Sequence, residues 1–222
     1  MASLSDLKRS WLLKMMGLSS SALSEADLAA LLYSDTSFNS GVRRVKTPAI
    51  RASNYFYPIS GGSNGTSSGL GNGNARHSPW IVEETIRIVR IGAEITTVGE
   101  AGSKLRLGIY DDSGTGLPAN LLLDAGQING DSATVQELTC DITLSPGIYW
   151  LVGAVQAAPT SQPTVRTHTV TTPDIICSSG SIPTTGLNMI GYSHSGVSGA
   201  LPASFVSAGI VGLAPRIFLR TA

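Results

Sequence analysis

The stretch ETIRIVRIGAEITTV, residues 84–98, decides the fold class of this chain. Its apolar residues recur at every second position, and their parity changes once: they are Ile86 and Ile88, followed by Val89, Ile91, Ala93 and Ile95. Because successive side chains of a strand point to opposite faces, this period predicts a half-buried β-strand. The change of parity predicts either a β-bulge or a strand that crosses from one sheet to another.

Further stretches have the patterns of strands. Alternate apolar residues lie on one face in KLRLGIY (104–110) and ELTCDITL (137–144), which predicts two half-buried strands. IYWLVGAV (148–155) is almost continuously apolar, which is typical of a central strand, and the chain closes with APRIFLRTA (214–222). Short strands with Gly and Pro between them predict a mainly β domain, an antiparallel β-sandwich of jelly-roll-like form.

Only residues 3–33 have a helical period. Two short amphipathic helices are expected, the first ended by Gly17 and the second begun by a capping-box pattern at Ser24 and Asp27. Two short helices bury little by themselves, so we expect their apolar stripes to dock on another polypeptide or, alternatively, on the β-domain of the same chain. The assembly residues predicted on these stripes are Leu4, Leu7, Trp11, Met15, Leu28, Leu31 and Leu32.

The chain is therefore predicted to have three parts. Residues 1–46 form a helical N-terminal adaptor, residues 47–79 a linker or long loop rich in Gly, Ser and Asn, and residues 80–222 the β-sandwich. The aromatic run NYFYPI (54–59) in the linker either anchors the connection to a neighbour or forms a short β-segment.

The composition excludes some partners. The formal net charge is +0, so the chain has no basic surplus for nucleic acid, and charged residues make up 14% of it against roughly 25% in ordinary soluble domains. A surface of Ser, Thr, Gly and Asn suits permanent contact with other subunits, although a neutral secreted domain is the alternative. No stretch reaches the roughly 18 apolar residues of a membrane span, so no membrane insertion is expected.

Neither metal nor cofactor is predicted. Cys140 and Cys177 lie far apart without a CxxC spacing, and we expect both to be buried free thiols. In GIYDDSGTGLPANLLL (108–123), Asp111 and Asp112 precede two glycines and a proline, which is the chemistry of a tight turn. A bound cation remains the alternative, although the regular oxygen spacing of a calcium loop is missing.

Catalytic signatures are absent from the sequence, and a non-enzymatic protein is predicted. The acidic residues have no spacing that singles out a glycosidase pair, and the histidines lie in polar contexts without a triad pattern. These residues are Glu83, Glu84, Glu94, Glu100 and Glu137, with His77, His168 and His194.

Four stretches carry a resemblance: SPWIVEETIRIVRIGAEITT, LRLGIYDDSGTGLPANLLLDAG, LSPGIYWLVGAVQ and APRIFLR. Together they resemble a β-sandwich domain of tailed-bacteriophage virion proteins, especially minor tail proteins and fibres. The opening SLSDLKRSWLLKMMGLSSSALSEADLAALLY is similar to the short helical N-terminal segment of small virion proteins from phages of actinobacteria. The resemblance covers most of the chain and implies a virion component, assembled in the host cytoplasm, with an adaptor and a displayed β-domain.

Its partners are then expected to be other virion proteins and copies of itself, with a homotrimer as the first expectation. Two alternatives stay open: a capsid decoration or head fibre protein, and a module that binds host cell-surface glycan. For the glycan module, the residues expected to stack on sugar rings are Trp80, Tyr110 and Tyr192, whereas Trp150 lies in a strand expected to be buried.

Overall fold

The computed structural model describes residues 52–57, 67–169, 190–206 and 209–222, all within the compact unit of residues 50–222. The seven predicted assembly residues of the N-terminal helices and Cys177 lie outside the described residues. No helix within the described ranges is long and apolar enough to cross a membrane.

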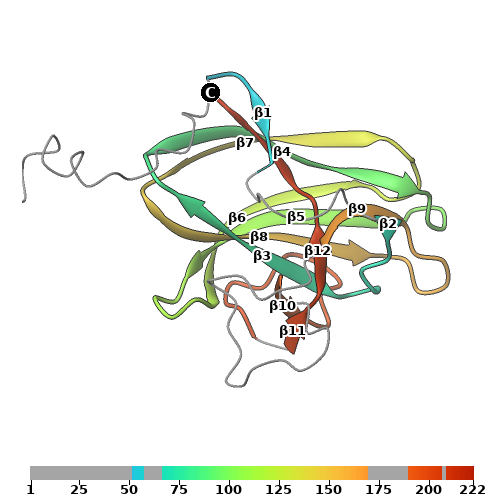
Figure 1. Ribbon diagram of the computed structural model, residues 1–222. Helices are drawn as coiled ribbons and strands as arrows, with labels where there is room; N and C mark the ends of the chain where they lie inside the picture. Colours follow the sequence, from blue (N-terminus) through green and yellow to red (C-terminus); the bar gives the residue numbers. More distant parts are fainter. Residues whose placement is uncertain (1–51, 58–66, 170–189, 207–208) are drawn as a thin grey trace, which may run out of the picture. The chain divides into compact units, whose positions relative to one another are not determined.

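The described part of the chain is mainly β, in two antiparallel sheets that lie face to face (Figure 1). One sheet has seven strands: β1 (Tyr55–Phe56), β2 (Ser67–Ser68), β4 (Ile86–Thr97), β7 (Val135–Leu144), β9 (Thr164–Thr169), β12 (Leu213–Pro215) and β13 (Phe218–Thr221). The other has six strands: β3 (Ala75–Val82), β5 (Lys104–Asp112), β6 (Pro118–Asn129), β8 (Gly147–Gln156), β10 (Gly191–His194) and β11 (Gly209–Val211). The predicted mainly β, antiparallel class is confirmed.

Strand β4 lies at the centre of the seven-stranded sheet. It pairs with β7 on one side and with β13 and then β9 on the other. The register against β13 shifts between Ile88 and Arg90, which pair with the adjacent residues Thr221 and Arg220, so Val89 is the extra residue of a β-bulge against β13. The register against β7 shifts at the same place, but there the extra residue lies on β7. The bulge alternative predicted from the change of parity is confirmed, because it lets Ile88 and Ile91 both point into the core at 0% exposure.

The main core lies between the two sheets. It is built from aliphatic side chains on the inner faces of β4, β5 and β8, among them Ile91, Leu107 and Leu151, which are all fully buried. Alternation on β7 leaves its solvent-side residues exposed, as predicted for a half-buried strand. Strand β8 lies between β3 and β5 and is buried from Trp150 to Gln156, which confirms its prediction as a central strand.

The β-domain begins upstream of residue 80. Strands β2 and β3 fall partly or wholly in the range expected to be linker, and Leu70 in that range is fully buried in the main core. The predicted end of the linker at residue 79 is therefore wrong, because isolated core residues such as Leu70 cannot be recognised within a stretch rich in Gly, Ser and Asn. Of the two alternatives for NYFYPI, the short β-segment is present, since Tyr55–Phe56 pairs with β13.

One open edge of the two-sheet structure is closed by a side chain. The carboxamide of Gln136, at the start of β7, accepts a hydrogen bond from the Asn129 N–H at 3.0 Å and donates one to the Asn129 carbonyl at 2.7 Å. Asn129 is the last residue of β6, in the opposite sheet. Gln136 therefore replaces the backbone partner that an edge residue lacks.

Candidate functional site

The outer face of the six-stranded sheet is covered by residues 197–206, which we call the cover segment. Val197 and Leu201 of this segment pack on an apolar cluster of the strands beneath that includes Tyr110 of β5 and Trp150 of β8. Tyr110 and Trp150 are both fully buried. Strand β5 was predicted to be half-buried, and this is wrong for its second half, because the cover segment excludes water from the face that the alternation assigned to solvent.

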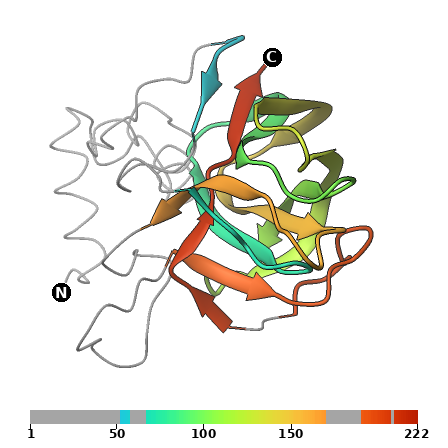
Figure 2. The same cartoon turned by 90° about the vertical axis from the view of Figure 1, so that its right-hand side faces the viewer.

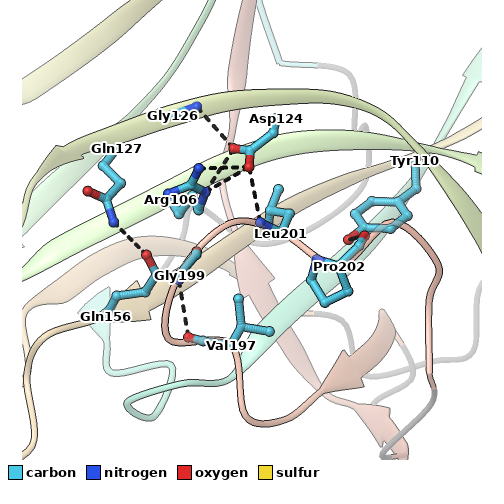
Figure 3. Close-up of polar contacts among 10 residues, drawn as sticks. All are labelled: Arg106, Tyr110, Asp124, Gly126, Gln127, Gln156, Val197, Gly199, Leu201 and Pro202. Atoms are coloured by element: carbon cyan, nitrogen blue, oxygen red, sulfur yellow. Dashed lines mark hydrogen bonds and ion pairs between the residues drawn. The ribbon is translucent and has the colours of Figure 1, made fainter.

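Asp124 of β6 joins the cover segment to the sheet (Figure 3). Its carboxylate accepts hydrogen bonds from the Arg106 guanidinium at 2.7–3.0 Å, from the Leu201 N–H at 3.0 Å and from the Gly126 N–H at 3.2 Å. Burial raises the pKa of Asp124, but these hydrogen bonds outweigh burial and hold the pKa below its usual value. The partly buried carboxylate therefore stays ionised and holds the cover segment against the sheet.

Two other side chains of the sheet bind carbonyl groups of the cover segment (Figure 3). The Tyr110 hydroxyl donates to the Pro202 carbonyl at 2.6 Å, and burial, with the nearby Asp124 charge, raises the pKa of Tyr110 to about 12. The Gln156 amide donates to the carbonyls of Val197 and Gly199 at 3.1 and 2.8 Å. The cover segment is thus fixed along its length.

These contacts determine which of the predicted glycan-binding rings are exposed to solvent. Trp80 faces the interior at 4% exposure and packs against Phe56 and Tyr149, while Tyr110 lies beneath the cover segment at 0%. The expectation that Trp80 and Tyr110 expose their rings to sugar is therefore wrong. Tyr192 is half-buried, and its ring packs against Trp150 and Phe205. Trp150 is buried as predicted.

Asp111 and Asp112 build the turn that follows β5, as predicted. The Asp112 carboxylate accepts hydrogen bonds from the N–H groups of Gly114 and Gly116 at 2.7 and 3.3 Å, and both glycines have positive φ, 84° and 76°. The same carboxylate accepts the Trp150 indole N–H at 2.9 Å, and Asp111 accepts the Asn120 N–H at 2.5 Å. The oxygen atoms thus bind the protein's own donors.

The histidines are distributed over both sheets. The His77 ring lies edge-on between Tyr110 and Phe205, with centroids 5.0 and 4.9 Å away, and burial lowers its pKa to about 3. His194 accepts the Val206 N–H at 3.2 Å. His168 lies on β9 of the other sheet, where burial lowers its pKa to about 4.

Three of the acidic residues named from the sequence have separate hydrogen-bond or ion-pair partners, and the other two are exposed. Glu94 and Glu137 bind arginines, Glu100 accepts the Thr160 N–H at 3.0 Å, and Glu83 and Glu84 are exposed beside β3. Cys140 is a free, half-buried thiol, and burial raises its pKa to about 11. No group of three or more His, Cys, Asp or Glu side chains within the described ranges is placed to hold a metal ion.

A second surface lies on the outer face of the seven-stranded sheet, where β1 runs beside β13 (Figures 1 and 2). The rings of Tyr55 and Tyr57 both meet the Phe218 ring edge-on, with centroids 5.7 and 6.2 Å away. The Arg216 guanidinium lies over the Tyr57 ring at 4.2 Å, and that of Arg220 over the Tyr55 ring at 5.5 Å. We call these five residues the aromatic–arginine face.

Two ion pairs flank the aromatic–arginine face. Arg166 binds Glu94 through two nitrogens, at 2.7 and 3.0 Å, and these bonds lower the pKa of Glu94. Arg90 lies 3.2 Å from Glu137, which also accepts the Tyr55 hydroxyl at 2.7 Å. The surface is therefore a connected network of rings, guanidinium groups and carboxylates.

The chain matches no protein-family model, and no curated protein is similar to it. The resemblance to phage tail and fibre proteins therefore stays a prediction.

Sequence reasoning did not single out Tyr55, Tyr57, Arg216 and Arg220 as site residues. A signal was present in NYFYPI, where two tyrosines stand two positions apart around a phenylalanine. On a strand this spacing puts both tyrosines on one face and the phenylalanine on the other. The arginines come from the other end of the chain, so their position next to the tyrosines follows only from the pairing of β1 with β13.

Proposed function

We propose that this protein is a structural component of a tailed-phage virion, of the minor tail or fibre class, that is assembled in the host cytoplasm. In this proposal residues 1–46 anchor the chain to the particle and a jelly-roll-like β-sandwich is displayed. Other virion proteins and further copies of this chain are its partners.

The observation that carries the proposal is the way the chain enters the β-domain. Strand β1, a few residues after the predicted adaptor, pairs antiparallel with β13, which in turn pairs with the central strand β4. The Ser53 N–H donates to the Ala222 carbonyl at 3.0 Å, and the Thr221 N–H donates to the Asn54 carbonyl at 3.3 Å. A load on the adaptor would therefore reach the sheet through backbone hydrogen bonds, which suits an anchored structural protein.

The use of polar residues in the described part agrees with this proposal. The carboxylates of Asp112 and Asp124 fix a turn and the cover segment, and those of Glu94 and Glu137 hold arginines on the surface. A chain with few charges and braced loops presents a stable body to neighbouring subunits.

Deletion of residues 1–46 tests the anchor. An epitope-tagged full chain and the deletion variant are expressed in cells that produce the particle, and the particles are purified and analysed by mass spectrometry. The full chain is expected in the particles, and the deletion variant is expected at less than about a tenth of that amount. Val135→Thr, at a 59% exposed position of β7, serves as the matched control.

The deletion variant must unfold at the same denaturant midpoint as the full chain, so that its loss reports anchoring and not misfolding. Equal incorporation of both proteins contradicts the anchor role. A low-resolution particle map with the chain located on the head would support the capsid decoration alternative instead. The homotrimer is tested by light scattering on the purified full chain, where a monomer at micromolar concentration counts against it.

A further inference from the structure

We propose that the aromatic–arginine face binds an acidic glycan, a polysaccharide whose sugar units carry carboxylates. This adds a binding activity to the structural role proposed above, and its site differs from the one expected from the sequence. The proposal depends on the exposure of two rings, on their rigid support and on the local excess of guanidinium groups.

The two tyrosines form a rigid stacking surface. Tyr55 and Tyr57 keep 53% and 43% of their surface in solvent, while Phe56 between them turns inward against Trp80. Both rings rest edge-on against Phe218, which is only 6% exposed. Tyrosine offers a large contact area at low cost in conformational entropy, and a sugar ring offers apolar C–H groups to such a surface.

Phe218 is itself held in place by the backbone beneath it. Its ring lies over Gly92 of β4, where a Cβ atom would come within 2.3 Å of the Phe218 Cζ atom. The glycine therefore lets the ring lie flat against the sheet and support both tyrosines. A binding surface that is fixed before the ligand arrives loses less entropy on binding.

The guanidinium groups give the face its charge preference. Among the described residues, Arg90, Arg166, Arg216 and Arg220 gather here with Glu94 and Glu137, and these six side chains together carry a charge of 4 − 2 = +2 on a chain whose net charge is +0. Arg90 and Arg166 contact the two carboxylates closely.

The other two arginines carry the positive excess. Arg216 is 3.9 Å from the already bonded Glu94, and no described carboxylate lies within ion-pair distance of Arg220. Guanidinium groups only donate hydrogen bonds, and their planar fork matches a carboxylate.

The same observations favour a glycan over other large ligands. The exposed large apolar side chains of the face are the two tyrosines, which is a small apolar core compared with a stable protein interface. Nucleic-acid sites neutralise many closely spaced phosphates with a large basic surplus, which a face with a charge of +2 on a neutral chain does not offer, whereas Glu94 and Glu137 can accept hydrogen bonds from sugar hydroxyls. Rings for stacking, donors for carboxylates and acceptors for hydroxyls are thus present together.

Binding is tested on the purified full chain with polygalacturonate, and with dextran as the neutral polysaccharide. Wild type is expected to be retarded by polygalacturonate in affinity electrophoresis and not by dextran, and the retardation is expected to weaken as salt is added. Tyr57→Ala and Arg216→Gln are each expected to weaken binding at least about tenfold, which corresponds to about 1.4 kcal/mol. Tyr57→Phe keeps the ring and is expected to bind more tightly than Tyr57→Ala.

Lys104→Gln is the matched control, because it removes one positive charge from β5 of the other sheet, where Lys104 binds Asn129. It is expected to bind within about twofold of wild type, since the lost charge lies away from the face. All variants are checked for an unchanged unfolding midpoint.

Three results would overturn the proposal: no retardation of wild type by polygalacturonate, equal retardation by dextran, or unchanged binding in both Tyr57→Ala and Arg216→Gln. Tighter binding of a single-stranded oligonucleotide would replace the glycan by a nucleic acid. These measurements use isolated protein, so their failure leaves the particle-incorporation test of the structural role untouched.

Discussion

His77 makes the stability of the β-domain sensitive to mild acid. Its ring lies between Tyr110 and Phe205 and is 0% exposed. Burial lowers the pKa of His77 to about 3, and the nearby His194 lowers it further. Because the unfolded chain binds a proton near pH 6.5 and the folded chain does not, lowering the pH favours unfolding.

The size of the effect follows from the two pKa values. With about 6.5 in the unfolded state and about 3 in the folded state, His77 alone lowers the free energy of unfolding by about 2 kcal/mol between about pH 8 and about pH 5. His168, with a folded pKa of about 4, adds a similar amount in the same direction. Both contributions are present above the unfolded pKa and are lost as the pH falls below it.

The carboxylates affect stability in a lower pH range than the histidines. The pKa values of Glu94, Asp124 and Asp141 are lowered in the folded chain, so their stabilisation is lost only below the usual carboxyl pKa of about 4. Loss of stability between about pH 8 and about pH 5 therefore reports the histidines.

Urea unfolding of wild type and His77→Phe at the two pH values measures the effect. We expect wild type to lose about 4 kcal/mol on acidification and His77→Phe to lose about 2 kcal/mol less than wild type. The comparison is made within each protein, so a packing cost of the larger ring cancels. Identical losses in the two proteins would show that the pKa of His77 is the same in the folded and unfolded states, and would refute the reasoning.

Three further predictions test packing and hydrogen bonds. Gly191→Ala would place a Cβ atom 1.7 Å from a carbonyl oxygen of β3, so we expect that this variant does not fold. Gly199→Ala is the control, because its Cβ would have no atom within 4 Å, and it should leave the thermal midpoint unchanged. Soluble yield and thermal melting curves measure both outcomes. Asp124→Asn should lower the free energy of unfolding by about 2–3 kcal/mol, because a partly buried guanidinium loses its charged partner. Asp141→Asn, at an exposed ion pair, should leave the free energy of unfolding almost unchanged. Asp112→Ala should lower the free energy of unfolding in urea by about 2 kcal/mol, because it removes the acceptor of the buried Trp150 indole N–H. A chelator should leave the unfolding midpoint of wild type unchanged. A lower midpoint in the presence of chelator would support a bound cation.

Local patterns predicted the strands well where one face of a strand meets the core. The change of parity between Ile88 and Ile91 has a single physical cause, the bulge at Val89 against β13, so it could be predicted from the sequence. The turn at Asp112 was predictable for the same reason, because its hydrogen bonds join residues two and four positions apart.

Features that depend on distant segments could not be predicted. Tyr110 looks like a solvent-side residue of an alternating strand, and it is buried because residues 197–206 fold back over it. Arg216 and Tyr57 lie 159 positions apart in the sequence and meet only after β1 and β13 pair. No local period contains that information, so the surface proposed to bind glycan was visible only once both sheets were assembled.

The hydrogen bond from Ser53 to Ala222 has a practical consequence for protein engineering. A fluorescent protein or affinity tag fused directly after Ala222 would emerge at the corner where the polypeptide enters its β-domain, beside strand β1. Such a fusion would sterically hinder access to that corner and interfere with binding or labelling experiments there. Insertion into the tip between Ser113 and Gly116, where Gly114 has open space around it, would leave the corner clear.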